Sequence, residues 1–346
     1  MKTLIMKNNK RKMKNILLPA LIVLLMTGCR KDLCYNHDEH GTDIRADVKA
    51  TWECEWERSD DFDWEIHWPD CSCGYDELRP EVANGIRAVI YNTEGTAYTE
   101  RNLKSEGGIL PMTEGMHSIL FYNNDTEYIV FEDLPSSATA TATTRTRTRS
   151  TFANTEAHDG ERTVNEPDML FGHYIEEHDA QRTAEPTALP ITMHPLVYTY
   201  MVRYEFSHGL EYVALARGGM AGMAESVYLQ DGHTGETTAT VLYDCVLTGY
   251  GTEAHVQTFG IPNYPGDGYT RADQTYTLNL EVCLKNGKLL NYNFDITDQL
   301  EDQPRGGVIT VTGIEVSDKD GTEGGSGFNP DIDGWGEYED IPMPIL

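Results

Sequence analysis

The sequence has little positive charge. Its 346 residues contain 27 Lys and Arg against 56 Asp and Glu, which gives a formal net charge of −29. A surface this acidic gains nothing from releasing the counterions of a polyanion, and no stretch of the chain interleaves basic with aromatic residues. The composition therefore argues against any nucleic-acid partner.

Long hydrophobic runs are also scarce. One uncharged apolar run, residues 16–26, follows six basic residues near the N-terminus and is too short to cross roughly 30 Å of hydrocarbon as a helix. It predicts a signal peptide over residues 1–28. The run ends at Met26-Thr27-Gly28-Cys29, which resembles a lipobox, so we expect Cys29 to carry diacylglycerol and palmitate. The chain would then be anchored in the outer membrane and exposed at the cell surface. An ordinary cleaved signal peptide with an incidental cysteine is the alternative.

Motifs of known enzyme classes are missing as well. Residues 173–178 come within one position of an inverted zinc-protease motif, but the spacing is wrong. The chain has no nucleophile elbow, Walker loop or dinucleotide fingerprint, and its glycine run at residues 324–327 is typical of a flexible linker. We therefore expect no enzyme, although a glycoside hydrolase needs only two carboxylates and would leave no motif.

Strand patterns fill the rest of the chain. Apolar and polar residues alternate over residues 44–56, as in a half-buried strand. Asn286-Gly287 lies between the apolar segments 275–284 and 288–296, which predicts a hairpin with a type I′ turn. One helical turn is expected at residues 220–226, and no long amphipathic helix. Further strands are expected at residues 86–91, 118–122, 127–131, 196–206, 210–216, 238–246, 256–259 and 308–316. Antiparallel β-sandwiches fit this pattern best.

Two polar tracts suggest the domain boundaries. Residues 136–150, rich in Ser, Ala and Thr with Arg145, Arg147 and Arg149, predict a mobile, protease-sensitive loop. The second tract, residues 176–190, predicts a boundary near residue 186. The expected organisation is a first β-domain over residues 29–186, a second over 187–316, and a flexible acidic tail over 317–346. The last residues of this tail, from about Gly336, are extended and apolar enough to lie along a sheet edge of this chain or of a partner.

Several phrases resemble a family of uncharacterised Bacteroidales lipoproteins related to fimbrillins and minor-fimbrial anchor proteins. They are Tyr-Asp-Glu-Leu-Arg-Pro at residues 75–80, Asn-Glu-Pro-Asp-Met-Leu-Phe-Gly at 165–172, and the segments 29–37, 115–123, 191–196 and 213–216. The resemblance implies an all-β fold of two tandem transthyretin-like antiparallel sandwiches. It also implies a structural or adhesive role, as a fimbrial anchor or accessory subunit that binds other fimbrial subunits. It supplies no catalytic residues.

Two metal sites are conceivable. Asn329, Asp331, Asp333, Glu337 and Asp340 follow the register of a calcium loop, although Asp replaces the final Glu and a solvated acidic tail explains them more simply. Cysteine and histidine ligands for zinc could come from Cys34, His37, His40, Cys71 and Cys73. In an exported protein these cysteines, with Cys54, Cys245 and Cys283, more often form disulfides, whose connectivity the sequence leaves open.

Four of the five tryptophans lie within seventeen residues. Trp64 and Trp68 stand among carboxylates, so exposed indoles could form a glycan-binding surface, or the rings could pack beneath a loop. The sequence thus leaves three classes of function: a structural or adhesive fimbrial lipoprotein, which we favour, a carbohydrate- or calcium-binding module, and a hydrolase.

Overall fold

The computed structural model describes residues 44–58, 62–149, 152–265, 274–323 and 339–341. Residues from Ile44 onward form one compact unit. The predicted signal peptide, Cys29, Cys34, His37 and His40 lie outside the described residues. Among those described, no helix is long and apolar enough to cross a membrane. The longest helices in the described ranges have five residues, α3 (Thr297–Glu301) and α4 (Asp318–Thr322), and the prediction of an all-β fold is confirmed.

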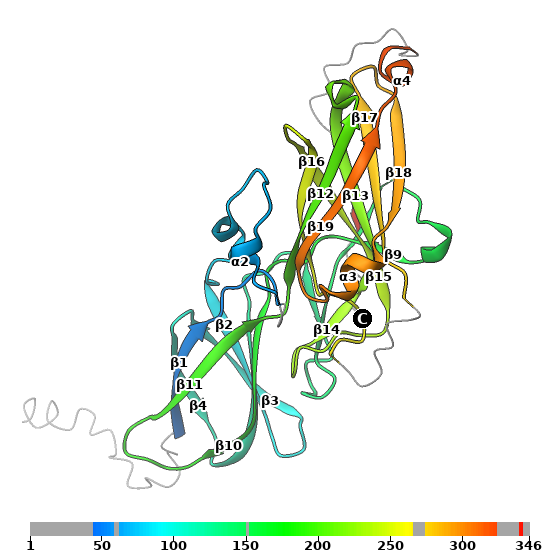
Figure 1. The fold of residues 1–346 in the computed structure, drawn as a ribbon. Helices are drawn as coiled ribbons and strands as arrows, with labels where there is room; N and C mark the ends of the chain where they lie inside the picture. Colours follow the sequence, from blue (N-terminus) through cyan, green and yellow to red (C-terminus); the bar gives the residue numbers. More distant parts are fainter. Residues whose placement is uncertain (1–43, 59–61, 150–151, 266–273, 324–338, 342–346) are drawn as a thin grey trace, which may run out of the picture. The chain divides into compact units, whose positions relative to one another are not determined.

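Seven strands close into a barrel in the order β1-β11-β10-β5-β2-β3-β4 (Figure 1). Their bounds are β1 Ile44–Trp52, β2 Gly85–Tyr91, β3 Ala97–Lys104, β4 Gly107–Met112, β5 Gly115–Asn123, β10 Phe171–Ala180 and β11 Thr187–Pro195. The alternation in β1 buries Ile44, Ala46 and Val48 inside the barrel. β1 pairs antiparallel with β4 and parallel with β11, so it closes the ring.

A larger sheet has the order β18-β17-β13-β15-β16-β12-β19 and carries green to orange strands in Figure 1. The bounds are β12 Tyr198–His208, β13 Val213–Ala224, β15 Thr238–Leu247, β16 Gly251–Thr258, β17 Thr277–Leu284, β18 Leu289–Asp295 and β19 Gly307–Glu315. β17 and β18 form the predicted hairpin, but the type I′ turn is wrong, because Gly287 has a positive φ of 80° and Asn286 does not. The helical turn expected at residues 220–226 is wrong, because this segment belongs to β13 and β14 (Ser226–Tyr228).

The boundary predicted near residue 186 is also wrong. β11 follows it and yet belongs to the barrel, where Leu189, Ile191 and Met193 face the same core as Val48. The tract that suggested a linker is divided between the end of β10, where Glu176 and Glu177 are exposed, the connection 181–186 and the start of β11. The chain passes to the larger sheet at Leu196 and Val197, both buried.

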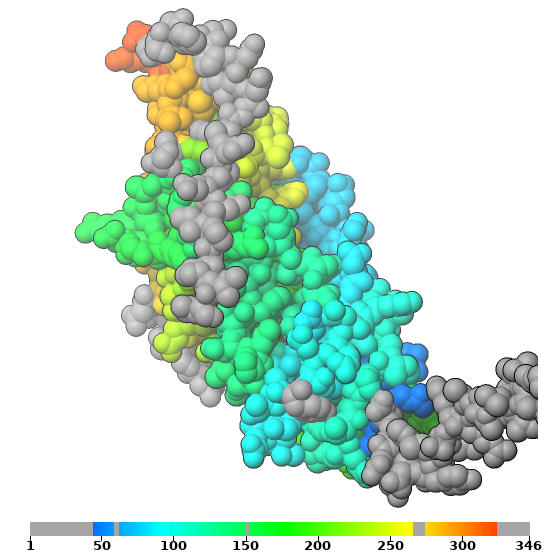
Figure 2. All heavy atoms as spheres, turned by 180° about the vertical axis from the view of Figure 1, so that it is seen from behind, coloured from blue at the N-terminus to red at the C-terminus, as the bar shows by residue number. Residues whose placement is uncertain are grey.

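The tract at residues 136–150 is not an exposed loop. It contains β7 (Thr141–Thr144), which pairs with β6 (Ile129–Glu132) and β14, and β8 (Thr146–Thr148), which pairs with β9 (Arg162–Val164). Threonine is β-branched and suits strands. Figure 2 shows the face on which the segments after this tract lie, in green.

The three arginines of the tract therefore do not project freely into solvent. Arg149 is 8% exposed and donates to the carbonyl of Gly218, while Arg147 donates to that of Leu242. Arg145 is half-buried. Proteases cut mobile backbone, and these arginines lie on or beside paired strands. The structure therefore does not support a protease-sensitive loop at Arg145, Arg147 and Arg149.

The tail is not uniformly flexible. It begins with α4, where the Ser317 side chain caps the helix, and its strand β20 (Glu339–Ile341) pairs antiparallel with β8. The register sets Asp340 opposite Arg147. This is the edge pairing expected for the segment beyond Gly336, made here within one chain.

Candidate functional site

The tryptophans chosen as a glycan surface are not exposed. Trp56 is 0% and Trp64 9% exposed, and Trp68 is half-buried. Their rings pack together, with centroids of Trp56 and Trp68 5.5 Å apart, and Trp68 donates its indole N–H to the Cys73 carbonyl. A stacking platform needs open ring faces, so the glycan-binding assignment of Trp64 and Trp68 is wrong. Packing beneath a loop, the alternative, is correct.

The phrase at residues 165–172 has a structural explanation. One carboxylate oxygen of Asp168 accepts hydrogen bonds from the backbone N–H groups of Glu127, Tyr128 and Ile129. Asn123 accepts from the N–H of Phe171 at 2.7 Å. The segment therefore fixes the loop before β6 against the barrel, and nothing in its geometry is catalytic.

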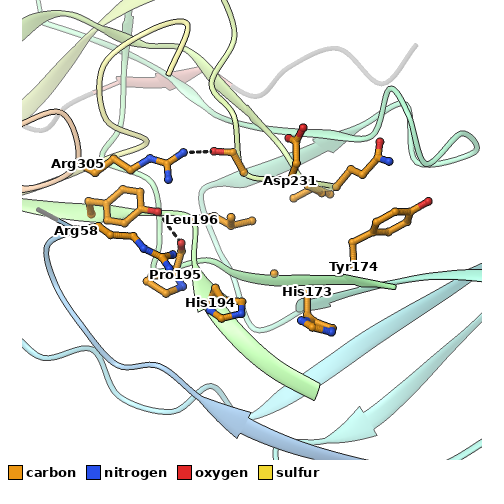
Figure 3. Close-up of a pocket in the computed structure, with 13 residues that line it drawn as sticks. Arg58, His173, Tyr174, His194, Pro195, Leu196, Asp231 and Arg305 are labelled. Carbon is orange, nitrogen blue, oxygen red and sulfur yellow. Dashed lines mark hydrogen bonds between the residues drawn. The ribbon is translucent and has the colours of Figure 1, made fainter. Parts of the chain in front are cut away.

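A cavity of about 310 Å³ is the strongest candidate for a binding site (Figure 3). Arg58 and Arg305 lie on one side of it, His173 and His194 at its floor, and Asp231 and Tyr174 on the other side. The remaining lining residues are Gly172, Pro195, Leu196, Tyr198, Leu229, Gln230 and Gly232. The floor comes from β10 and β11, where Gly172 pairs with His194.

The two arginines are held beside each other by backbone and side-chain contacts. The N–H of Arg58 donates to the carbonyl of Arg305 at 2.7 Å. The Arg305 guanidinium lies over the rings of Tyr198 and Tyr264, 5.4 and 5.1 Å from their centroids, and donates to the Gly232 carbonyl at 2.6 Å. Its orientation is therefore set before any ligand arrives.

The polar groups around this cavity differ in charge. His194 contacts the Glu53 carboxylate at 2.5 Å, and the same carboxylate lies 3.8 Å from Arg58. Burial, with a smaller contribution from His194, lowers the pKa of His173, which favours the neutral imidazole at pH 7. Asp231 is paired with His233 outside the cavity. The arrangement can bind a ligand by charge and hydrogen bonds, but it shows no activated nucleophile.

A second hollow of about 410 Å³ lies further along β10, at Glu176 and Glu177. It is lined by Asn92, Thr93, Gly95, Met116, His117, Ser118, Ser137, Tyr174, Glu176 and Glu177. Tyr174 is shared with the first cavity, but no arginine or lysine lines this hollow.

No metal centre is found in the described part of the chain, where no three His, Cys, Asp or Glu side chains are grouped for one ion. Asn329, Asp331, Asp333 and Glu337 lie outside the described residues, so the calcium loop stays a prediction, and Asp340 is placed only as a residue of β20. Of the zinc candidates, Cys71 and Cys73 are described. Burial raises the pKa of Cys73 to about 12, so its thiol stays protonated.

The described cysteines, Cys54, Cys71, Cys73, Cys245 and Cys283, carry free thiols, so the disulfides expected among them are absent from this part of the chain. Cys34 lies outside it. Cys283 is buried in β17, and Cys245 packs against the core of the larger sheet. Both act as small apolar residues.

The carboxyl group of Glu166 has a raised pKa. Burial raises its pKa to about 7, and the hydrogen bond from the Gln257 N–H and the charge of Arg147 only partly oppose this. Because the folded state then holds the proton more tightly than the unfolded chain does, stability falls as pH rises from about 4.3, the usual glutamate pKa. The loss is complete above the folded pKa.

We therefore expect Glu166→Gln to flatten this pH dependence. The parent should lose about 2 kcal/mol of unfolding free energy through this group between pH 5 and pH 8, and the variant should not lose it. Urea denaturation at both values measures it. Glu177→Gln, an exposed change on β10, is the control and should follow the parent. Equal pH profiles for Glu166→Gln and the parent would contradict the prediction.

Sequence reasoning missed the first cavity. Its walls come from residue 58, residues 172–174, 194–196, 198 and 229–232, and residue 305, which the closed barrel and the return of the chain after α3 bring together. Arg305 precedes two glycines at positive φ, Gly306 and Gly307, and this was the one local signal that the backbone makes an unusual turn there.

Comparisons with known proteins agree with the fold. A family profile described as "Domain of unknown function (DUF5119)" matches residues 66–244. Over 362 aligned positions the chain is 23% identical to the Bacteroides ovatus protein named "Putative fimbrium anchoring subunit Fim4B", covering 95% of this chain and 97% of that protein. The relation to fimbrial anchor proteins inferred from the sequence phrases is thereby confirmed.

Solved structures are similar as well. The crystal structure of a "putative adhesin" from Bacteroides ovatus has a TM-score of 0.58 at 20% identity, covering 84% of this chain and 97% of that chain. The fimbrial anchor protein Mfa2 from Porphyromonas gingivalis has a TM-score of 0.42 at 10% identity, covering 78% and 90%. The first likeness shows that this fold occurs in a solved protein of nearly the same extent.

Proposed function

This chain belongs to the DUF5119 family, and we propose that it is a cell-surface lipoprotein that serves as an anchor or accessory subunit of a fimbrium. The observation that carries this proposal is its similarity to a fimbrium anchoring subunit over nearly the whole length of both chains. A match that covers 95% of this chain is not confined to one common β-domain.

The architecture supports a structural role. An anchor must hold a polymer through contacts between sheets, and exposed strand edges provide them. The pairing of β20 with the short strand β8 shows that this sheet accepts an added strand at its edge. The described residues show no activated nucleophile and no metal cluster that would favour catalysis instead.

Attachment to the outer membrane would come from the lipid on Cys29. The apolar run before it is too short to remain as a membrane span, so the acyl chains would provide the hydrophobic anchor. Fimbrial subunits are then the protein partners of the remainder of the chain.

Cys29→Ala tests this function. We expect the variant protein to leave the membrane fraction or to stay unprocessed, and fimbriae to be shed into the medium instead of remaining on the cells. Fractionation and immunoblotting for this protein and for the fimbrial subunit measure both effects. Cys54→Ala, which changes a cysteine within the described unit, is the matched control and should keep both on the cell.

The two readouts separate the two parts of the proposal. Variant protein that stays in the membrane like the parent contradicts lipid anchoring at Cys29. Release of the protein while fimbriae remain attached contradicts the anchoring function.

A further inference from the structure

We propose that the cavity between Arg58, Arg305 and Asp231 binds an acidic sugar, that is, a pyranose ring bearing a carboxylate. This inference is independent of the fimbrial role, since it rests on the lining of the cavity alone. It also assigns glycan recognition to residues far from the tryptophans that the sequence suggested.

The first argument is the pair of arginines. The whole chain is strongly acidic, yet two guanidinium groups face one cavity and their backbones are hydrogen-bonded to each other. Nη2 of Arg305 is used by the carbonyls of Gly232 and Tyr264, and its other nitrogens donate to no described residue. Arg58 lies 3.8 Å from the Glu53 carboxylate and interacts with the side chain of Tyr198, which also lines the cavity. A carboxylate is the group that such planar donors bind best.

The second argument is the opposite wall. Asp231, Gln230 and Tyr174 also line the cavity, and Asp231 and Tyr174 lie across it from the arginines (Figure 3). One oxygen of Asp231 is paired with His233, and its second oxygen, the Gln230 amide and the Tyr174 ring suit sugar hydroxyls and the apolar face of a pyranose. Asp231 also limits the charge of the ligand. One carboxylate is balanced by the arginines, but a phosphate with two charges would be repelled by Asp231 and Glu53.

Size and strand pairing narrow the ligand further. A volume of about 310 Å³ corresponds to roughly ten water molecules, which is enough for one sugar ring and its substituents. A peptide with a free carboxyl end would need an open strand edge beside the cavity. The strands of the floor are paired with each other there, Phe171 with Pro195 and Gly172 with His194, so they offer none.

Titration calorimetry on the mature chain tests the proposal. The probes are N-acetylneuraminic, glucuronic and galacturonic acid, with the methyl glycosides of glucose and galactose as neutral counterparts. We expect at least one of the acids to bind, at least about tenfold more tightly than the neutral sugars, since loss of one charged hydrogen-bonded contact costs roughly this factor. Which acid binds separates a sialic from a uronic acid.

Arg58→Gln should weaken the binding of that acid about tenfold or more. Arg87→Gln is the matched control, because Arg87 is a partly exposed barrel arginine that pairs with Glu100 at 2.9 Å away from the cavity. Arg58→Lys keeps the charge without the planar fork and should give an intermediate affinity, and unchanged melting temperatures would show that all three variants fold.

Four results would overturn the inference. They are no binding of any acid up to about 10 mM, equal binding of the neutral sugars, equal loss with Arg87→Gln, and binding of a short peptide carboxylate in place of the sugars. If Arg58→Gln does not fold, the Arg58→Lys variant takes its place. An affinity of this variant equal to that of the parent would also overturn the inference.

Discussion

Replacing Trp56 with alanine is expected to lower the free energy of unfolding by about 3–5 kcal/mol, the range for a buried large aromatic side chain. Trp56 is 0% exposed and stands at the centre of a cluster with Trp64, Trp68 and Tyr75. Met201 of β12 and Val308 of β19 complete this cluster. Alanine would leave a cavity that cannot collapse, because strands of the larger sheet form one wall.

The backbone at this position strengthens the expectation. The carbonyl of Trp56 accepts the N–H of Thr199 at the start of β12, so the residue joins the loop after β1 to the larger sheet. The indole N–H of Trp56 has no hydrogen-bond partner among the described residues. Trp56→Phe removes that unpaired group and keeps most of the packing, so it should cost less than Trp56→Ala.

Urea denaturation followed by circular dichroism measures these changes. Ile66→Ala is the control, since Ile66 lies in α2 (Trp64–His67) of the same segment but is 75% exposed, and its loss should change stability by less than about 0.5 kcal/mol. A Trp56→Ala protein as stable as Ile66→Ala would show that the cluster does not hold this segment in place.

The parts of the fold that the sequence predicted are those set by local pattern. The alternation of Ile44, Ala46 and Val48 against polar residues predicted β1, and Asn286-Gly287 predicted the turn between β17 and β18. In both cases the signal and the structure depend on the same few neighbouring residues. Trp56 shows the limit of such a pattern, because the alternation continued to it although the strand ends at Trp52.

The parts that were wrong depend on residues distant in the chain. The Thr and Arg tract has no apolar stripe, yet Arg149 reaches Gly218 and Asn279 on other strands and becomes buried. β11 looked like the start of a second domain, because its pairing with β1, 141 residues away at Lys49 and Pro190, leaves no local trace. The candidate cavity was missed for the same reason, since its lining residues Arg58, His194 and Arg305 are far apart in the sequence.

Breaking the ion pair between Arg217 and Glu281 is the second change with a large expected effect. The two residues face each other across β13 and β17 in register, and their side chains are 7% and 1% exposed. Arg217 donates to one carboxylate oxygen of Glu281 from Nε at 2.9 Å and from Nη2 at 2.5 Å. We expect Glu281→Ala to cost about 3–5 kcal/mol, because it removes the carboxylate that is hydrogen-bonded to the buried Arg217 guanidinium.

The matched double variant separates a charge effect from a packing effect. Arg217→Met combined with Glu281→Leu removes both charges and fills the space with apolar groups, so its stability should return to within about 1–2 kcal/mol of the parent or exceed it. Glu106→Ala, which removes an exposed partner of Lys104 at 3.8 Å, should change stability by less than about 1 kcal/mol. If the double variant is as unstable as Glu281→Ala, the ion pair itself stabilises the sheet. If instead the double variant regains the stability of the parent, as we expect, the ion pair adds little stability, and each charge is buried only because the other one balances it.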